Sequence, residues 1–131
     1  MAEWSEFALI DRYFTGLGAA RADVELGVGD DAALVLADRA RLALALDTLV
    51  EGVHFPADLP AEAVGYRALA VNLSDMAAMG ASPLWALMGL TLPAIDEPWV
   101  AGFAAGIDRL ARAHGIGIIG GDITRGPRSV S

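Results

Sequence analysis

Residues 61–83 have the sequence AEAVGYRALAVNLSDMAAMGASP, and this stretch decides the fold because it is predicted to form one long helix. Pro60 suits the first turn of a helix. Gly80 suits the left-handed residue that follows a helix end, and Pro83 prevents any continuation. The start and stop signals agree, so we expect the rest of the chain to be organised around this helix.

A polar cluster of Asn72, Ser74 and Asp75 lies in the middle of this helix among apolar residues. Asn72 and Asp75 are three positions apart and therefore project from the same face. An ionised carboxylate in apolar surroundings is costly unless a cation or several hydrogen-bond donors meet it. Taken alone, the cluster is explained slightly better by hydrogen bonds between helices in a core than by a functional site.

Three further aspartate sites change this balance because they occur in similar settings, beside glycines or at the end of an aliphatic run. They are Asp30–Asp31, Asp47 and Asp122. Recurrent acids placed next to glycine-framed turns are typical of a ligand site. We therefore expect the four sites to converge in the folded chain.

The composition is that of one acidic globular domain. The chain has 131 residues, of which 55% are hydrophobic, and a net charge of −8 from 17 acidic and nine basic residues. All nine basic residues are arginine, and none of them form a basic run. These features argue against nucleic acid or an anionic membrane surface as a partner.

Compartment signals are few. Cysteine is absent, which excludes a disulfide framework, a thiolate zinc site and a cysteine nucleophile. The N-terminus carries Glu3 and Glu6 where a signal peptide would be basic, and no apolar run has the length of a membrane span. We expect a cytoplasmic protein.

Hydrophobic periodicity and turn signals predict the remaining elements. An amphipathic helix is expected over residues 4–14, followed by a polar loop over residues 21–31. A further helix, capped by Asp96, is expected to end at Gly115. Strands are expected at residues 33–36, 42–46, 84–92 and 116–119. The first two strands are expected to be neighbours joined by a tight turn at Asp38 and Arg39.

This order of elements predicts an α+β fold, a mixed four-stranded sheet with helices covering one face. Residues 1–131 are expected to be a single domain without repeats or linkers. An alternating pattern begins just before Ser131, so we expect a fragment cut at a domain boundary.

Aspartates mixed with glycine-framed turns suit a magnesium–polyphosphate site, because hard cations take carboxylate and phosphate oxygens. Other nucleotide sites are excluded. A P-loop needs a lysine, and no dinucleotide-type glycine fingerprint stands between a strand and a helix. The two histidines are not at a metal-ligand spacing, and no nucleophile elbow supports a serine hydrolase.

Four motifs resemble the N-terminal half of thiamine-monophosphate kinases. They are GDDAA over residues 29–33, DTLVEGVHF over 47–55, NLSDMAAMGASP over 72–83 and GGD over 120–122. The second and third are the most specific, and all four occur in the family's order. The wider superfamily shares its ATP-binding architecture with aminoimidazole ribonucleotide synthetase, whose N-terminal fold this resemblance implies.

The resemblance implies a function and a site. The family phosphorylates thiamine monophosphate to thiamine diphosphate with ATP, using several Mg²⁺ ions held by aspartates. The matching metal positions are Asp30, Asp47, Asp75 and Asp122. His54 matches a substrate-contacting histidine, although a loop histidine that merely packs beside Phe55 is the alternative. The positions expected beside the nucleotide phosphates are Asp31, Asn72, Ser74, Gly120 and Gly121.

Family members also form homodimers in which two N-terminal sheets join into a barrel, which implies a homodimer here. One departure from the family is that Ala45 and Leu46 replace the usual hydroxyl residues before Asp47. The family's second domain is absent, so the fragment alone is expected to be inactive. Alternative assignments are selenophosphate synthetase, the hydrogenase maturation factor of the same superfamily, or a non-catalytic dimerisation module.

Overall fold

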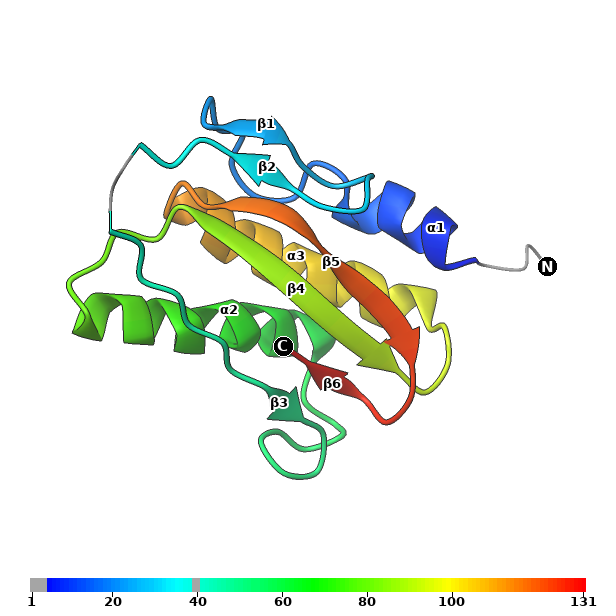
Figure 1. Cartoon of the computed structure of the whole chain (residues 1–131). Coiled ribbons are helices and arrows are strands. Elements are labelled where there is room, and N and C mark those ends of the chain that lie inside the picture. The colour runs from blue at the N-terminus through cyan, green and yellow to red at the C-terminus, as the bar shows by residue number, and fades with distance from the viewer. Residues whose placement is uncertain (1–4, 39–40) are drawn as a thin grey trace.

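The computed structural model describes residues 5–38 and 41–131. Its helices and strands follow the order that Figure 1 shows from blue to red. They are α1 (Glu6–Leu9), the π-helix η1 (Ile10–Phe14), β1 (Val24–Leu26), β2 (Leu34–Val35), β3 (Leu49–Val50), α2 (Ala61–Ala78), β4 (Trp85–Leu92), α3 (Glu97–Ala113), β5 (Gly117–Arg125) and β6 (Ser129–Val130). No helix among these described residues is long and apolar enough to cross a membrane.

The main sheet has the strand order β3-β6-β4-β5. β4 and β5 are parallel, whereas β6 is antiparallel to both β3 and β4. Helices α2 and α3 lie together against one face of this sheet (Figure 1). The predicted fold class, a mixed four-stranded sheet covered on one face by helices, is therefore confirmed.

The register of the sheet separates a buried face from an open one. One row across all four strands pairs Leu49 with Val130, Val130 with Leu90, and Leu90 with Ile123, and all four side chains are buried. They pack with side chains of the two helices in a single core, which includes Val64, Leu69, Phe103 and Ile107. Successive side chains alternate between faces, so the neighbouring rows point away from the helices.

Helices α2 and α3 approach each other so closely that their contact depends on glycines. A Cβ atom built on Gly65 would lie 2.1 Å from the Phe103 carbonyl oxygen. A Cβ atom on Gly106 would lie 2.0 Å from the Glu62 carbonyl oxygen. Backbone therefore packs against backbone at this crossing, a feature that the sequence analysis did not predict.

The predicted helix ends have clear physical causes. Gly80 follows α2 with a φ of +64°, and Asp96 caps α3 by accepting a hydrogen bond from the Trp99 amide at 3.3 Å. Ser5 caps the first helix in the same way, through the Ala8 amide at 3.2 Å. The helix predicted over residues 4–14 is confirmed from Glu6 onward, and Trp4 lies outside the described residues.

The predicted strand over residues 42–46 is wrong. Residues 41–48 have no assigned secondary structure, and Leu42, Leu44 and Leu46 are 48%, 89% and 76% exposed. The expected pairing with residues 33–36 is also wrong, because β2 pairs with β1. The turn proposed at Asp38 and Arg39 falls partly outside the described residues.

β1 pairs with β2, and hydrogen bonds to the side chain of Asp23 fix the residue directly before β1. The Arg21 guanidinium donates two hydrogen bonds to Asp23, at 2.9 and 2.7 Å, and the Trp85 indole donates a third at 3.1 Å. These hydrogen bonds hold the pKa of the Asp23 carboxyl below its usual value, and those from Arg21 contribute most. This segment was predicted to be loop, because its polar side chains hide the strand.

The last long strand extends beyond its prediction. β5 was expected to end at Ile119 and to deliver Asp122 into a loop, but pairing with β4 continues to Arg125. Asp122 therefore lies inside a strand. The extension passes through Gly121, where φ is +152° and where a Cβ atom would lie 1.8 Å from the Met88 carbonyl oxygen.

The close contact between α2 and α3 predicts that an added methyl group at the crossing destabilises the fold. Gly106→Ala is expected to lower the free energy of unfolding by about 1–3 kcal/mol, since the new methyl group meets backbone that cannot rotate away. Urea unfolding followed by circular dichroism measures the change. The control is Gly27→Ala, whose Cβ atom would meet nothing closer than 3.8 Å. Equal unfolding midpoints for the two variants would contradict the account.

Candidate functional site

The polar cluster of α2 lies where the helix leaves the core. Leu69 is buried, but Ser74 and Asp75 are exposed. Met79, the C-cap residue, is also exposed. The interpretation of Asp75 as a buried group that hydrogen-bonds another helix is therefore wrong. Its carboxylate faces outward and is available to a ligand.

Only one of the two polar atoms of the Asn72 side chain has a hydrogen-bond partner. Its Nδ2 donates to the Ala68 carbonyl oxygen at 3.0 Å, one turn back in the same helix. Its Oδ1 is buried and has no hydrogen-bond partner. Buried polar atoms are nearly always paired, and an amide oxygen can only accept hydrogen bonds or ligate a cation. The free oxygen is thus suited to a metal ion, a hydroxyl group or a bound water.

A polar row crosses the open face of the sheet. The Thr48 and Ser131 hydroxyls are 2.8 Å apart, and Ser131 exchanges two backbone hydrogen bonds with Gly89, at 2.7 and 2.8 Å. Gly89 is in register with Asp122, which is exposed. Three strand steps of about 4.8 Å separate Thr48 from Asp122, roughly 14 Å in all. A single ion cannot bridge the two ends of this row.

The remaining acidic pair lies in a turn between β1 and β2. Gly29 has a φ of +121°, and the Asp31 amide donates to the Asp30 carboxylate at 2.8 Å. Both aspartates are exposed. The Asp30 carboxylate uses Oδ1 to accept from the amide of the next residue, so its Oδ2 is available to a ligand.

His54 is exposed in the tight loop that joins β3 to the segment before α2. Its Nδ1 accepts a hydrogen bond from the Val50 amide at 2.9 Å. The next residue, Phe55, is buried and anchors the loop in the core. The imidazole thus has a polar partner within its own loop, and both the substrate contact and the packing beside Phe55 stay predictions.

The predicted residues do not form one compact cluster. Among residues 5–38 and 41–131, no three His, Cys, Asp or Glu side chains are close enough to hold a metal ion together. The donors are nevertheless all oxygen atoms, and one of them, Asn72 Oδ1, is an orphan acceptor. This donor set fits Mg²⁺, which takes one or two carboxylates and completes its shell with phosphate oxygens and water.

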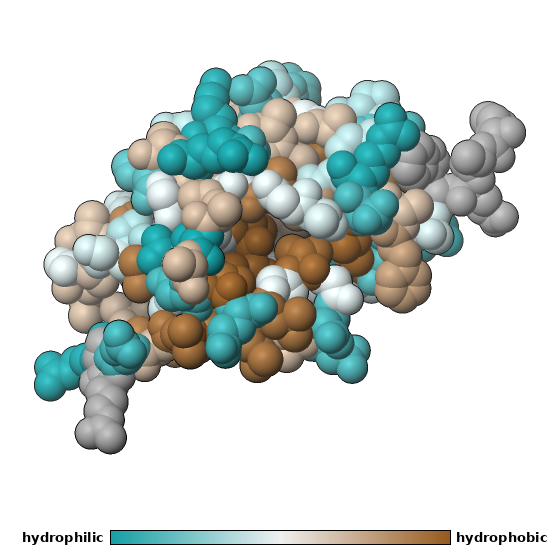
Figure 2. Space-filling view, turned by 90° about the horizontal axis from the view of Figure 1, so that it is seen from above, coloured by the Kyte–Doolittle hydropathy of each residue, from teal (hydrophilic) through white to brown (hydrophobic). Residues whose placement is uncertain are grey.

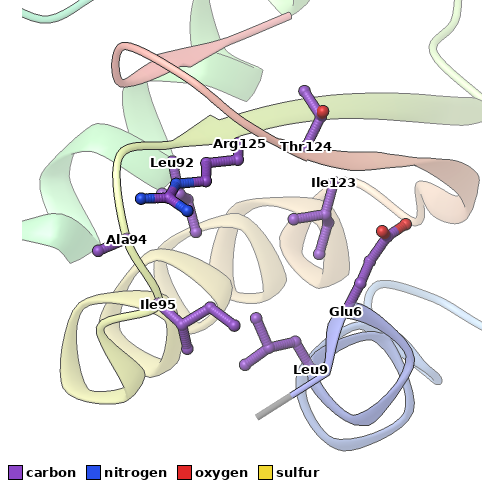
Figure 3. Close-up of a pocket in the computed structure, with 8 residues that line it drawn as sticks. All are labelled: Glu6, Leu9, Leu92, Ala94, Ile95, Ile123, Thr124 and Arg125. Carbon is purple, nitrogen blue, oxygen red and sulfur yellow. The ribbon is translucent and has the colours of Figure 1, made fainter. Parts of the chain in front are cut away.

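A cavity of about 520 Å³, which no sequence signal predicts, lies between α1 and the ends of β4 and β5. Figure 3 shows Leu9, Ile95 and Ile123 pointing toward one another across it, with Glu6 and Arg125 at its edges. The lining residues are Glu6, Leu9, Leu92, Ala94, Ile95, Ile123, Thr124 and Arg125. None of them is a predicted site residue, and no motif signalled the cavity.

The fold and the acidic motifs define a class of protein. The chain belongs to the family described as AIR synthase related protein, N-terminal domain, which matches residues 29–131. Within that class, the similar proteins are thiamine-monophosphate kinases. The one from Escherichia coli K12 is 49% identical over 127 residues, which are 96% of this chain and 39% of that protein.

The similar solved structures are also those of thiamine-monophosphate kinases. The crystal structure of thiamine-monophosphate kinase from Stenotrophomonas maltophilia K279a matches with a TM-score of 0.80 and 44% identity, over 99% of this chain and 40% of that one. AaThiL, solved as a complex with AMPPCP and TMP, matches with a TM-score of 0.61 and 39% identity, over 64% of this chain and 28% of that one. The chain spans about two fifths of the length of the curated relatives it matches.

The orphan acceptor of Asn72 makes a testable prediction. Asn72→Leu is expected to leave the free energy of unfolding unchanged or slightly higher, because it removes a buried unsatisfied oxygen and keeps the side-chain volume. Leu69→Ala, three residues earlier on α2, is the matched control and should cost about 2–5 kcal/mol. Urea unfolding in the absence of ligand measures both. A loss for Asn72→Leu as large as that for Leu69→Ala would show that Asn72 is structural.

Proposed function

We propose that this chain is the N-terminal part of a thiamine-monophosphate kinase, which transfers a phosphoryl group from ATP to thiamine monophosphate and forms thiamine diphosphate. The observation that carries the proposal is the 49% identity over 127 residues to enzymes of that name. The complex of AaThiL with AMPPCP and TMP supports the two substrates.

The proposed metal ligands are Asp30, Asp47, Asp75 and Asp122, with Mg²⁺ as the ion. When bound, Mg²⁺ neutralises the charge of the polyphosphate, which these acids alone would repel. Because the acids stand apart on the fold, we propose that they hold several ions. Asp31, Asn72, Ser74, Gly120 and Gly121 complete the nucleotide-phosphate side of the site.

The chain's own part in the reaction is to position the substrates. Phosphoryl transfer requires alignment and charge neutralisation more than a protein nucleophile, so the absence of cysteine and lysine is no obstacle. The acceptor is a phosphate and is already ionised, so no general base is needed. We propose that His54 contacts this acceptor. No residue of the chain is proposed as a covalent catalyst.

Two features restrict the ligands that this chain can supply to metal ions and substrates. Ala45 and Leu46 are exposed and carry no hydroxyl group, so ligands at this position must come from the backbone or from Asp47. The chain also spans only 39% of its relatives' length. We propose that the remaining substrate contacts come from sequence beyond it and that the isolated chain does not turn over ATP.

A chimera tests the proposed function. This chain replaces the matching 127 residues of the Escherichia coli relative, and thiamine diphosphate formation from ATP and thiamine monophosphate is measured. The parent chimera is expected to be active, and Asp75→Asn to lose about 100-fold or more in rate, since even indirect metal partners contribute 10–100-fold. Asp58→Asn, an exposed acid outside the site, is the control.

The outcomes of the chimera assay separate the alternatives. A folded but inactive parent chimera would contradict the kinase proposal and favour selenophosphate synthetase, the hydrogenase maturation factor or a non-catalytic module. Full activity of the Asp75→Asn chimera would contradict the metal role of α2 while leaving the reaction intact.

We also propose a homodimer in which the N-terminal sheets of two copies join. Figure 2, seen from above the molecule in Figure 1, over β1 and β2, shows hydrophobic residues gathered near the centre between hydrophilic ones. Large exposed aliphatic side chains on β2 or just after it, in residues 42–46 and on β4 support the proposal: Leu34, Leu36, Leu42, Leu44, Leu46 and Leu87. A second copy would cover them and provide the partner strand that residues 42–46 lack, as in a barrel formed by two sheets.

Analytical ultracentrifugation tests the dimer. The chain is expected to sediment as a dimer, and Leu44→Ser to shift it toward monomer, because the substitution removes the most exposed leucine of the proposed interface. Phe7→Ser changes another highly exposed apolar residue, on α1, and should leave the dimer intact. A monomeric parent chain, or dissociation by Phe7→Ser instead of Leu44→Ser, would refute this interface.

A further inference from the structure

One ion pair lies outside the residues proposed above to contact metal ions or substrates. Arg128, just before β6, lies with Nη1 at 2.5 Å from Oε2 of Glu51, and their side chains are only 15% and 27% exposed. The guanidinium also stacks over the Trp99 ring of α3, 4.6 Å from its centroid. A partly buried ion pair is weak support for stability, since apolar residues can replace it at little cost. The pair therefore calls for another explanation.

The pair holds one end of the loop that carries His54. The Glu51 amide donates to the Arg128 carbonyl oxygen at 3.1 Å, so side chain and backbone of the two residues are both joined. Within the loop, the Gly52 amide donates to the Phe55 carbonyl oxygen at 2.8 Å. The His54 amide donates to the Val50 carbonyl oxygen at 2.8 Å. The loop is thus tied at both ends, by the ion pair and by buried Phe55.

The same loop determines which imidazole nitrogen of His54 faces outward. A backbone amide can only donate, so the nitrogen that accepts from Val50, Nδ1, must carry a lone pair. In a neutral imidazole the proton is then on Nε2. Because His54 is exposed, it presents this Nε2–H group as a hydrogen-bond donor to whatever binds beside the loop.

We propose that Glu51 and Arg128 are positioning residues for His54. Their ion pair keeps the Val50 amide bonded to Nδ1 and thereby aims Nε2–H at an anionic oxygen of the acceptor. The chemical class of that acceptor, a phosphate monoester, rests on the proposed function. The positioning itself rests on contacts within this chain, so it can be tested without substrate.

Hydrogen exchange at the Val50 amide, followed by NMR on this chain, is the direct test. Arg128→Met and His54→Ala are each expected to raise the exchange rate about tenfold, the value for one lost hydrogen bond. The double variant should exchange no faster than either single variant, because both changes break the same bond. Arg112→Met is the control, since it removes a distant arginine that pairs with Asp108.

An unchanged Val50 exchange rate in Arg128→Met, or additive effects in the double variant, would overturn the positioning role. If Arg128→Met does not fold, Glu51→Gln removes the charge from the other partner and is read in the same way. In an active chimera, Arg128→Met should raise the KM for thiamine monophosphate and leave that for ATP unchanged; equal changes would overturn the acceptor contact. An inactive parent chimera would overturn the acceptor class together with the proposed function, whereas the exchange measurement still decides the positioning.

Discussion

The fold depends on the close approach of α2 and α3. At Gly65 and Gly106 the two helices leave no room for a single Cβ atom, so their backbones fix the distance and angle of the crossing. α2 carries the polar cluster beyond this crossing, and α3 connects the two parallel strands of the sheet. The place of Asn72 and Asp75 relative to the sheet is therefore set by glycines that have no chemistry of their own.

The two faces of the main sheet differ in character: one is buried and apolar, and the other carries an open polar row. The row of Leu49, Val130, Leu90 and Ile123 is buried under the helices, where each side chain contributes apolar burial. The neighbouring row, from Thr48 to Asp122, stays open and polar. Because alternate residues of the same strands point to the two faces, side chains can change on the open face without disturbing the core on the other.

Local signals predicted the elements that local physics determines. Pro60, Gly80 and Asp96 mark helix ends through capping and backbone conformation, and α2 and α3 follow from them. The errors concern pairing. An alternating run such as residues 42–46 becomes a strand only beside a free edge, and Asp122 entered β5 because β4 is long enough to pair with it. The motifs identified candidate site residues, but their spacing in the fold, the helix crossing and the Arg128 contact depend on tertiary structure.

An NMR titration of the isotope-labelled chain tests most directly whether its acidic motifs form a Mg²⁺-dependent nucleotide site. A non-hydrolysable ATP analogue is added with and without Mg²⁺, and amide shifts are followed. We expect Mg²⁺-dependent shifts at residues 30–31, 47, 72–75 and 120–122. Shifts confined to the cavity lined by Glu6 and Arg125, or no dependence on Mg²⁺, would contradict it.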